Sequence, residues 1–228
     1  MCNPSLSSAS TSTSGPAVGS IPRIGDKVPN FRAMTTHGEI EFEKWRDGKW
    51  VVLFSHPADF TPVCSTELVG LGQRTAEFEK RSCKLIGISV DSIHSHLAWI
   101  QNLDKITGTR LPFPLVADSD RAVSELFGMI HPGESATATV RALFFIDPKG
   151  VVRAQIYYPL NVGRSIDEIV RVLEALQTAD SKGVACPANW KPGDKVIVPP
   201  PKTMKEVDER LAATYDEKLD FYLCKKTI

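Results

Sequence analysis

Residues 61–64, Thr-Pro-Val-Cys, place a cysteine where a helix is expected to begin. Thr is a favourable N-cap residue, and Pro suits the first helical position because it lacks the N–H that has no partner there. The segment therefore predicts Thr61 as N-cap, Pro62 as the first helical residue and Cys64 in the first turn. Free backbone N–H groups and the helix dipole favour an anion at that place, which for cysteine is the nucleophilic thiolate. Cys64 is the strongest nucleophile candidate, although a small buried and inert cysteine fits the same segment.

The other four cysteines carry weaker signals. Cys83 opens an apolar run and is expected to be inert. Cys2 lies in a Ser- and Thr-rich leader, and Cys186 lies in a proline-containing linker where no catalytic role is indicated. No two cysteines stand at Cys-x-x-Cys spacing, which argues against a structural zinc site or a dithiol motif. An odd number of scattered cysteines is typical of free thiols in a reducing compartment, so we expect a cytoplasmic protein.

Apolar runs typical of strands alternate with helical patterns along the chain. The strands and helices that they predict must position Cys64. Runs typical of strands cover residues 50–55, 83–91 and 113–118, and residues 142–158 predict two strands joined by a turn at 147–150. Apolar residues at helical spacing cover 68–78, 97–103 and 165–179. The last helix has Ser165 as a plausible N-cap and Glu168 three residues later, which predicts a capping box. Alternating strands and helices favour an α/β sheet with helices on its faces.

Composition divides the chain into three parts and argues against some functional classes of protein. Residues 1–20 predict a disordered leader, residues 21–183 the main domain, and the proline-rich residues 184–228 a smaller C-terminal domain. The chain has 27 basic and 27 acidic residues, which argues against a nucleic-acid partner. It contains neither a run of eighteen apolar residues nor a secretory signal, so no membrane association is expected.

The segment LFSHPADFTPVCSTEL, residues 53–68, resembles the active site of the 1-Cys (type six) peroxiredoxins. Pro57, Thr61 and Cys64 match the family's Pro-x-x-x-Thr-x-x-Cys signature. The resemblance runs from about Pro22 to the C-terminus and leaves out only the leader. It implies a thioredoxin-like fold with a central mixed sheet flanked by helices, and a small C-terminal dimerisation domain.

The resemblance also implies a role for each matching residue. Cys64 corresponds to the cysteine that attacks a peroxide and becomes a sulfenic acid. Thr61 corresponds to the hydroxyl that bonds the thiolate and the peroxide, and Pro57 to the residue that shields the sulfur from water. Arg141 corresponds to the arginine that stabilises the thiolate and the charge developing on the breaking O–O bond.

Four further residues carry supporting or open assignments. His56 and Glu67 match the branch pattern, with positioning of Arg141 or hydrogen bonding to it as their implied roles. Arg164 corresponds to a position near the pocket, but a surface charge before the last long helix explains it equally well. Cys224 is a possible resolving cysteine, because a sulfenic acid condenses with any thiol that reaches it.

The implied activity is a thiol-dependent peroxidase that reduces hydrogen peroxide and organic hydroperoxides. An external thiol of the glutathione or thioredoxin type would complete the cycle, and neither a metal nor another cofactor is expected. The resemblance implies a homodimer or a larger assembly. The alternative is a redox sensor or chaperone-like protein that signals through oxidation of Cys64. A thioredoxin-like disulfide reductase is disfavoured because it needs a Cys-x-x-Cys pair.

Overall fold

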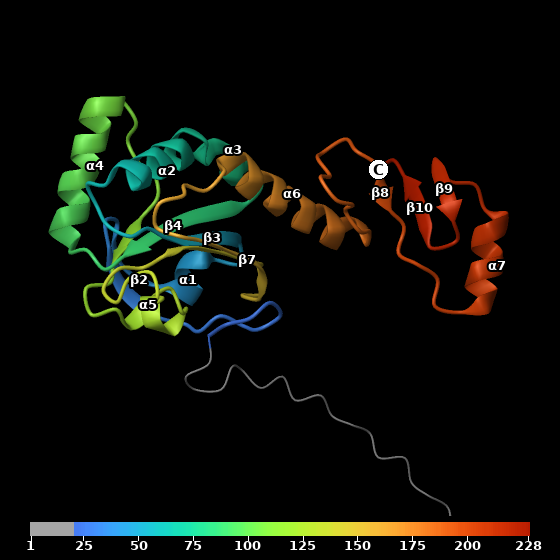
Figure 1. The fold of residues 1–228 in the computed structure, drawn as a ribbon, viewed down its shortest axis with the longest axis horizontal. Helices are drawn as coiled ribbons and strands as arrows, with labels where there is room; N and C mark the ends of the chain where they lie inside the picture. The colour runs from blue at the N-terminus through green and yellow to red at the C-terminus, as the bar shows by residue number, and fades with distance from the viewer. Residues whose placement is uncertain (1–20) are drawn as a thin grey trace, which may run out of the picture.

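The computed structural model describes residues 21–228, so the leader expected at 1–20 lies outside the described residues. The described chain forms a seven-stranded sheet of order β2-β1-β5-β4-β3-β6-β7 and a three-stranded sheet of order β8-β10-β9. Figure 1 shows the small sheet beyond the end of helix α6 (Ile166–Lys182). No helix in the described part of the chain is long and apolar enough to cross a membrane.

The centre of the large sheet is formed by β3 (Trp50–Ser55), β4 (Cys83–Ser89) and β6 (Arg141–Ile146). Strand β3 pairs in parallel with β4 and antiparallel with β6, while β5 (Leu115–Ala117) pairs in parallel with β4. Every residue of β3 and β6 is buried. Helices cover both faces of these strands, which explains why their sequences are continuously apolar rather than alternating.

The edges of the sheet are less apparent from the sequence. Strand β7 (Val152–Tyr158) follows β6 through the predicted turn, but β1 (Arg32–Thr35) and β2 (Gly38–Glu41) were not predicted. Both are short antiparallel strands, and most of their residues are half-buried or exposed. Strands of this kind lack the apolar run that identifies a central strand.

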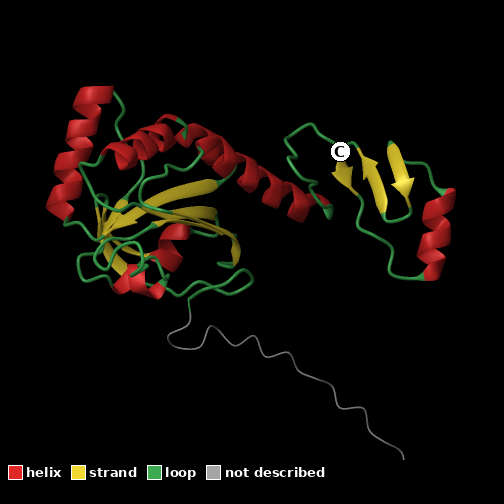
Figure 2. Ribbon diagram, in the orientation of Figure 1, coloured by secondary structure: helices red, strands yellow, loops and turns green. Residues whose placement is uncertain are grey.

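Two layers of helices enclose the sheet, as Figure 2 shows. One face carries α2 (Pro62–Gln73), α3 (Thr75–Lys80), α4 (Ile93–Thr107) and α6, whose apolar side chains form one core cluster with Cys64. The other face carries the short helices α1 (Phe42–Arg46) and α5 (Ala122–Leu126), which contribute to a second cluster. Cys64 therefore lies on the face that the longer helices cover.

Helix α6 begins almost as predicted, with Ser165 as N-cap accepting a hydrogen bond from the backbone N–H of Glu168. The full capping box predicted there is wrong. The side chain of Glu168 bonds Arg171 one turn further along the helix. A true capping box joins Thr203 and Glu206 at the start of α7 (Met204–Ala212), within the C-terminal part of the chain.

The small sheet consists of β8 (Val196–Ile197), β9 (Glu217–Asp220) and β10 (Leu223–Lys226). Its strands were not predicted, because two of them are short and polar. Val184, Trp190 and Val196 form a separate apolar cluster beside the end of α6. This cluster is consistent with the C-terminal domain expected from residue 184, although that boundary stays a prediction.

Candidate active site

Helix α2 places Cys64 as the local sequence predicts. Thr61 occupies the N-cap position, Pro62 is the first helical residue and Cys64 lies in the first turn with a fully buried side chain. One detail was wrong, since the Thr61 side chain does not cap the helix. Its hydroxyl instead donates to the carbonyl of Ala58 at 2.8 Å. The first-turn N–H groups around the sulfur therefore receive no capping oxygen from Thr61.

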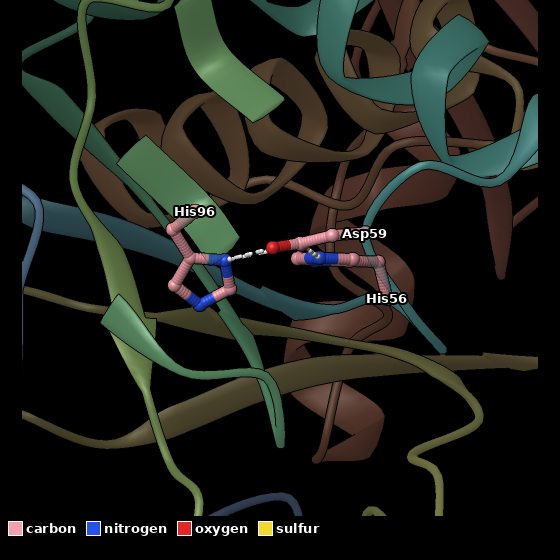
Figure 3. Close-up of side chains that lie close together, drawn as sticks. All are labelled: His56, Asp59 and His96. Carbon is pink, nitrogen blue, oxygen red and sulfur yellow. Dashed lines mark hydrogen bonds and ion pairs between the residues drawn. The ribbon is translucent and has the colours of Figure 1, made fainter. Parts of the chain in front are cut away.

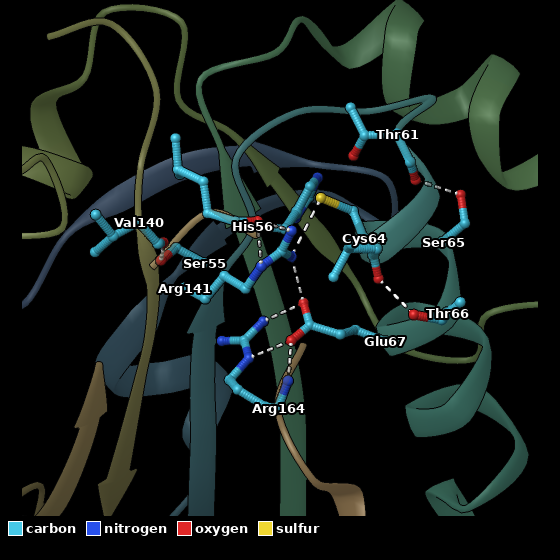
Figure 4. Close-up of polar contacts among 12 residues, drawn as sticks. Ser55, His56, Thr61, Cys64, Ser65, Thr66, Glu67, Val140, Arg141 and Arg164 are labelled. Carbon is cyan, nitrogen blue, oxygen red and sulfur yellow. Dashed lines mark hydrogen bonds and ion pairs between the residues drawn. The ribbon is translucent and has the colours of Figure 1, made fainter. Parts of the chain in front are cut away.

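Arg141 brings a fixed positive charge to the sulfur. It is the first residue of β6, and its Nη1 donates to Cys64 Sγ at 3.4 Å (Figure 4). The carbonyl of Leu160 accepts hydrogen bonds from Nε at 3.0 Å and from Nη2 at 2.6 Å. Because these bonds hold the other edge of the guanidinium, its position does not depend on the sulfur. The arrangement can stabilise negative charge on sulfur without reorganising.

Glu67 joins two arginines beneath the sulfur. It lies three residues after Cys64 on α2, and its Oε2 accepts from Arg141 Nη1 at 2.7 Å. Its Oε1 accepts from Arg164 Nε at 2.8 Å and from the Arg164 backbone N–H at 2.7 Å. A further bond, from Arg164 Nη1 to the Ala142 carbonyl at 2.7 Å, anchors the second guanidinium to β6.

The charges of this cluster do not cancel. Burial raises the pKa of Glu67, but the charges and hydrogen bonds of Arg164 and Arg141 lower it more, so its pKa lies below the ordinary value and the carboxylate is ionised. Two guanidinium groups and one carboxylate leave one positive charge in a buried site. A thiolate at Cys64 would neutralise that charge, which is costly to bury alone.

The sequence left two interpretations of Arg164 open, a residue near the pocket and a surface charge. The residue is buried and bonded to Glu67, not exposed on the surface. Its guanidinium also lies over the ring of Phe54, 5.5 Å from the centroid. The sequence could not decide this, because the partner of Arg164 is 97 residues away along the chain.

Of the two supporting roles left open for His56, hydrogen bonding to Arg141 is not the one that the structure has, because the ring bonds Asp59 instead. The Nε2 atom of His56 lies 2.9 Å from Oδ1 of Asp59, and the same carboxylate meets Nδ1 of His96 (Figure 3). Neither Asp59 nor His96 was among the candidate site residues predicted from the sequence. The available signal was the helical spacing of His96 with the buried Trp99, which places both on the inner face of α4.

Pro57 follows β3 directly and is half-buried in the turn that leads to α2. This position is compatible with the shielding role that the resemblance implies. Among the described residues, His56, Asp59 and His96 are also the one group whose possible metal-ligating atoms converge, all within 4.8 Å of one another.

The remaining described cysteines are also free. Burial raises the pKa of Cys83, at the start of β4, to about 12. Burial also raises the pKa of Cys186, although the charge of Arg171 opposes this. Cys224 is buried in β10, and Figure 1 shows this strand well separated from the start of α2 in the same chain.

Two family models match the chain. Residues 24–155 match the AhpC/TSA family, and residues 175–215 match the C-terminal domain of 1-Cys peroxiredoxin. A peroxiredoxin of Aquifex aeolicus is 51% identical over 219 residues, covering 92% of this chain and 98% of the relative. Peroxiredoxin 2 of Caldanaerobacter subterraneus subsp. tengcongensis is 50% identical over 209 residues, covering 91% and 94%.

Two solved structures are similar over most of their length. A yeast mitochondrial 1-Cys peroxiredoxin, solved to explain its thiol resolving mechanism via glutathione/thioredoxin systems, has a TM-score of 0.82 and 40% identity, covering 91% of this chain and 100% of that one. Peroxiredoxin 6 of Arenicola marina has a TM-score of 0.80 and 36% identity, covering 90% and 97%.

Proposed function

The chain belongs to the peroxiredoxin family and is a thiol-dependent peroxidase, and we propose that Cys64 is the residue that attacks the peroxide. Its mixed sheet and flanking helices form the thioredoxin-like fold predicted from the sequence, extended by the small antiparallel sheet. The contact between Arg141 Nη1 and Cys64 Sγ at the start of α2 is the observation that supports the assignment most directly.

In the proposed reaction the thiolate of Cys64 attacks the hydroxyl oxygen of the peroxide. A sulfur–oxygen bond forms and the O–O bond breaks, so sulfur is oxidised and the peroxide is reduced. The departing oxygen takes up a proton and leaves as water or an alcohol, and the cysteine becomes a sulfenic acid. Arg141 stabilises the thiolate before the attack and the negative charge that develops during it.

Thr61 and Pro57 complete the proposed site. The hydroxyl of Thr61 donates to Ala58 in the resting protein. Rotation about its C–O bond would let it donate to the thiolate or to the departing peroxide oxygen instead. Pro57 is proposed to limit the access of water to the sulfur from the turn after β3. Glu67 and Arg164 hold Arg141 in place through the shared carboxylate.

We further propose that an external thiol of the glutathione or thioredoxin type reduces the sulfenic acid. The first thiol condenses with the sulfenic acid to give a mixed disulfide and water, and a second thiol reduces that disulfide. The separation of β10 from α2 in Figure 1 favours an external thiol over Cys224 of the same chain. We also propose that the protein assembles as a homodimer through the C-terminal domain and that it is located in the cytoplasm.

Stopped-flow measurement of peroxide consumption with different thiol donors tests this function. We expect many turnovers per protein molecule with at least one donor, for hydrogen peroxide and for an organic hydroperoxide. A single turnover followed by slow recovery with every donor would contradict the enzyme and would favour a redox sensor that acts through oxidation of Cys64.

A further inference from the structure

His56, Asp59 and His96 form a hydrogen-bonded row that the proposed reaction leaves without a role (Figure 3). Both imidazole side chains are fully buried, and the carboxylate is 1% exposed. His56 and Asp59 belong to the loop between β3 and α2, whereas His96 belongs to α4. The row therefore ties the loop that precedes Cys64 to a helix of the rigid core.

The contacts of His96 define its protonation state. Its Nδ1 lies 2.8 Å from Oδ2 of Asp59, and its Nε2 lies 3.1 Å from the carbonyl of Val116. A carbonyl oxygen and an ionised carboxylate can only accept hydrogen bonds, so both ring nitrogens must donate. Only the imidazolium has two N–H groups, and His96 is therefore positively charged beside the negative Asp59.

The charge of Asp59 supports this assignment. Burial raises the pKa of this carboxyl, but hydrogen bonds from His56 and His96 lower it more, so its pKa lies well below the ordinary value. The backbone N–H of Asp59 also donates to Asp91 at 3.0 Å, which fixes the loop. Asp59 is thus an ionised acceptor held between two imidazoles.

The contacts of His56 leave one nitrogen unused. Burial lowers the pKa of its imidazole, so the ring is neutral, and its single N–H is on Nε2 because that atom faces the carboxylate of Asp59. The lone pair is then on Nδ1, which is buried and has no hydrogen-bond partner among residues 21–228. A buried acceptor without a donor is destabilising, so a native structure that keeps one calls for an explanation.

Strand pairing places the His56 ring on the same face of the sheet as the sulfur. Phe54 of β3 is opposite Leu143 of β6, so extending the antiparallel register by two residues brings His56 opposite Arg141. Residues two apart on a strand share a face, and Phe54 and Leu143 both belong to the core cluster of Cys64. Figure 4 draws the imidazole within the group of side chains around the sulfur.

A metal ion explains the row less well than protons do. Tetrahedral zinc with bonds of about 2.0–2.1 Å keeps its ligand atoms about 3.3 Å apart. The two imidazole nitrogens lie 2.9 and 2.8 Å from the carboxylate oxygens of Asp59, which are hydrogen-bond distances.

We propose that Asp59 and His96 are positioning residues for the reaction at Cys64, a role that rests on the proposed function. The imidazolium of His96 fixes the carboxylate of Asp59, which in turn holds His56 with its proton on Nε2 and its lone pair on Nδ1. Nδ1 then accepts a hydrogen bond from the O–H of the oxygen under attack. That oxygen keeps its hydrogen as it moves from the peroxide to the sulfenic acid.

Nitrogen NMR of the reduced, full-length protein with labelled histidines tests the row directly. At neutral pH we expect His96 to carry protons on both ring nitrogens and His56 to carry one on Nε2 only. Zinc added alone should shift neither signal. A neutral His96, a proton on Nδ1 of His56, or stoichiometric zinc binding that is lost in Asp59→Asn would overturn the proposal. None of these outcomes depends on which residue attacks the peroxide.

Kinetics separates positioning from simple structural support. In His96→Asn the amide can still donate to Asp59, whereas His96→Leu removes the donor. We expect the rate constant for oxidation of Cys64 by peroxide to fall about 10- to 100-fold in His96→Leu, the scale of a lost orienting contact, and less in His96→Asn. His94→Asn, an exposed position on the same helix, is the matched control and should leave the rate unchanged.

A folded His96→Leu protein that reacts at the wild-type rate would overturn the proposal, as would equal losses in the leucine and asparagine variants. If the leucine variant does not fold, the decision rests on the NMR of the wild-type protein and on the rate of His96→Asn. That rate is expected to be reduced but measurable.

Discussion

Cys64 and Cys83 belong to the same apolar cluster, but their surroundings differ. Cys83 is the first residue of β4, paired with the first residue of β3, and its sulfur has only backbone contacts, such as the one to the carbonyl of Lys84 at 3.6 Å. Cys64 lies beyond the other end of β3, in the first turn of α2, with Arg141 against its sulfur. Both side chains are almost completely buried.

The difference shows that burial alone does not produce a reactive thiol. Desolvation without a compensating charge raises the pKa of Cys83 to about 12, so that sulfur stays protonated at neutral pH. Cys64 is buried to the same degree, but it lies at a helix start and against a guanidinium, two features that favour the anionic form of a thiol. If solvent exposure were used to identify the reactive cysteine, it would select Cys186, the one described cysteine that is half-buried. No catalytic role is indicated for that residue.

Exchanging each sulfur for oxygen gives the largest expected difference between the two sites. Cys64→Ser should remove enzymatic peroxide consumption, because serine at this site cannot form a sulfenic acid. Cys83→Ser should keep the rate within about twofold and lower the free energy of unfolding by about 1–3 kcal/mol, since it buries a poorly bonded hydroxyl. Stopped-flow kinetics and chemical denaturation measure the two effects. Full activity of Cys64→Ser would rule out the assignment.

Replacing Arg141 should make the surroundings of Cys64 more like those of Cys83. Arg141→Lys keeps a charge but cannot bond Cys64, Glu67 and Leu160 together, so we expect the rate constant with peroxide to fall about 100- to 1000-fold. Arg153→Lys, on neighbouring β7 and paired with Asp180, is the matched control. A rate within twofold of wild type for Arg141→Lys would show that the guanidinium geometry is unimportant.

Glu67 links the reactive site to stability and to pH. Its pKa is lowered in the folded protein, so its stabilisation is present above the ordinary value near 4.5 and is lost as the pH falls through the folded pKa. Glu67→Gln should lower the free energy of unfolding by about 3 kcal/mol at neutral pH, because it leaves buried arginine charges uncompensated.

Denaturation at several pH values measures this effect. Below pH 4.5 the wild-type protein should lose stability more steeply than Glu67→Gln, so that the two curves converge. The exposed Glu39→Gln serves as control and should follow the wild-type curve. Parallel curves for wild type and Glu67→Gln would contradict the depressed pKa.

The smallest expected effect concerns Cys224. Its side chain is buried in β10, where the sulfur lies 3.3 Å from the carbonyl of Asp220. Cys224→Ser should change the steady-state rate with an external thiol by less than about twofold, because the proposed cycle does not use this residue. Mass spectrometry of the peroxide-treated protein provides the second measurement. A Cys64–Cys224 disulfide would contradict the cycle with a single cysteine.

The sequence predicted best what depends on neighbouring residues. The apolar run at 50–55 and the helix start at Pro62 follow from local periodicity and capping, and the structure has both. The edge strands β1 and β2 were missed because they are short and polar. The side-chain hydroxyl of Thr61 has a nearby acceptor in Ala58 that no capping rule anticipates.

The polar partners within the site were beyond prediction because they join distant parts of the chain. Arg141 was identified through the resemblance, but the anchoring of its guanidinium by Leu160 depends on the path of the loop after β7. Arg164 is buried against Glu67, and Asp59, in the loop before α2, meets His96 of helix α4. Such pairs become visible only when the fold brings the segments together.

The ionisation of Cys64 is the most direct test of the difference between the two buried cysteines. Thiolate absorbance can be followed against pH in the wild-type protein and in Cys64→Ser, so that the difference reports this sulfur alone. The signal should be present at pH 7 and should disappear only on acidification, while Cys83 contributes none. If it appeared only above about pH 8.5, where an ordinary cysteine ionises, Arg141 and the helix start would not activate Cys64.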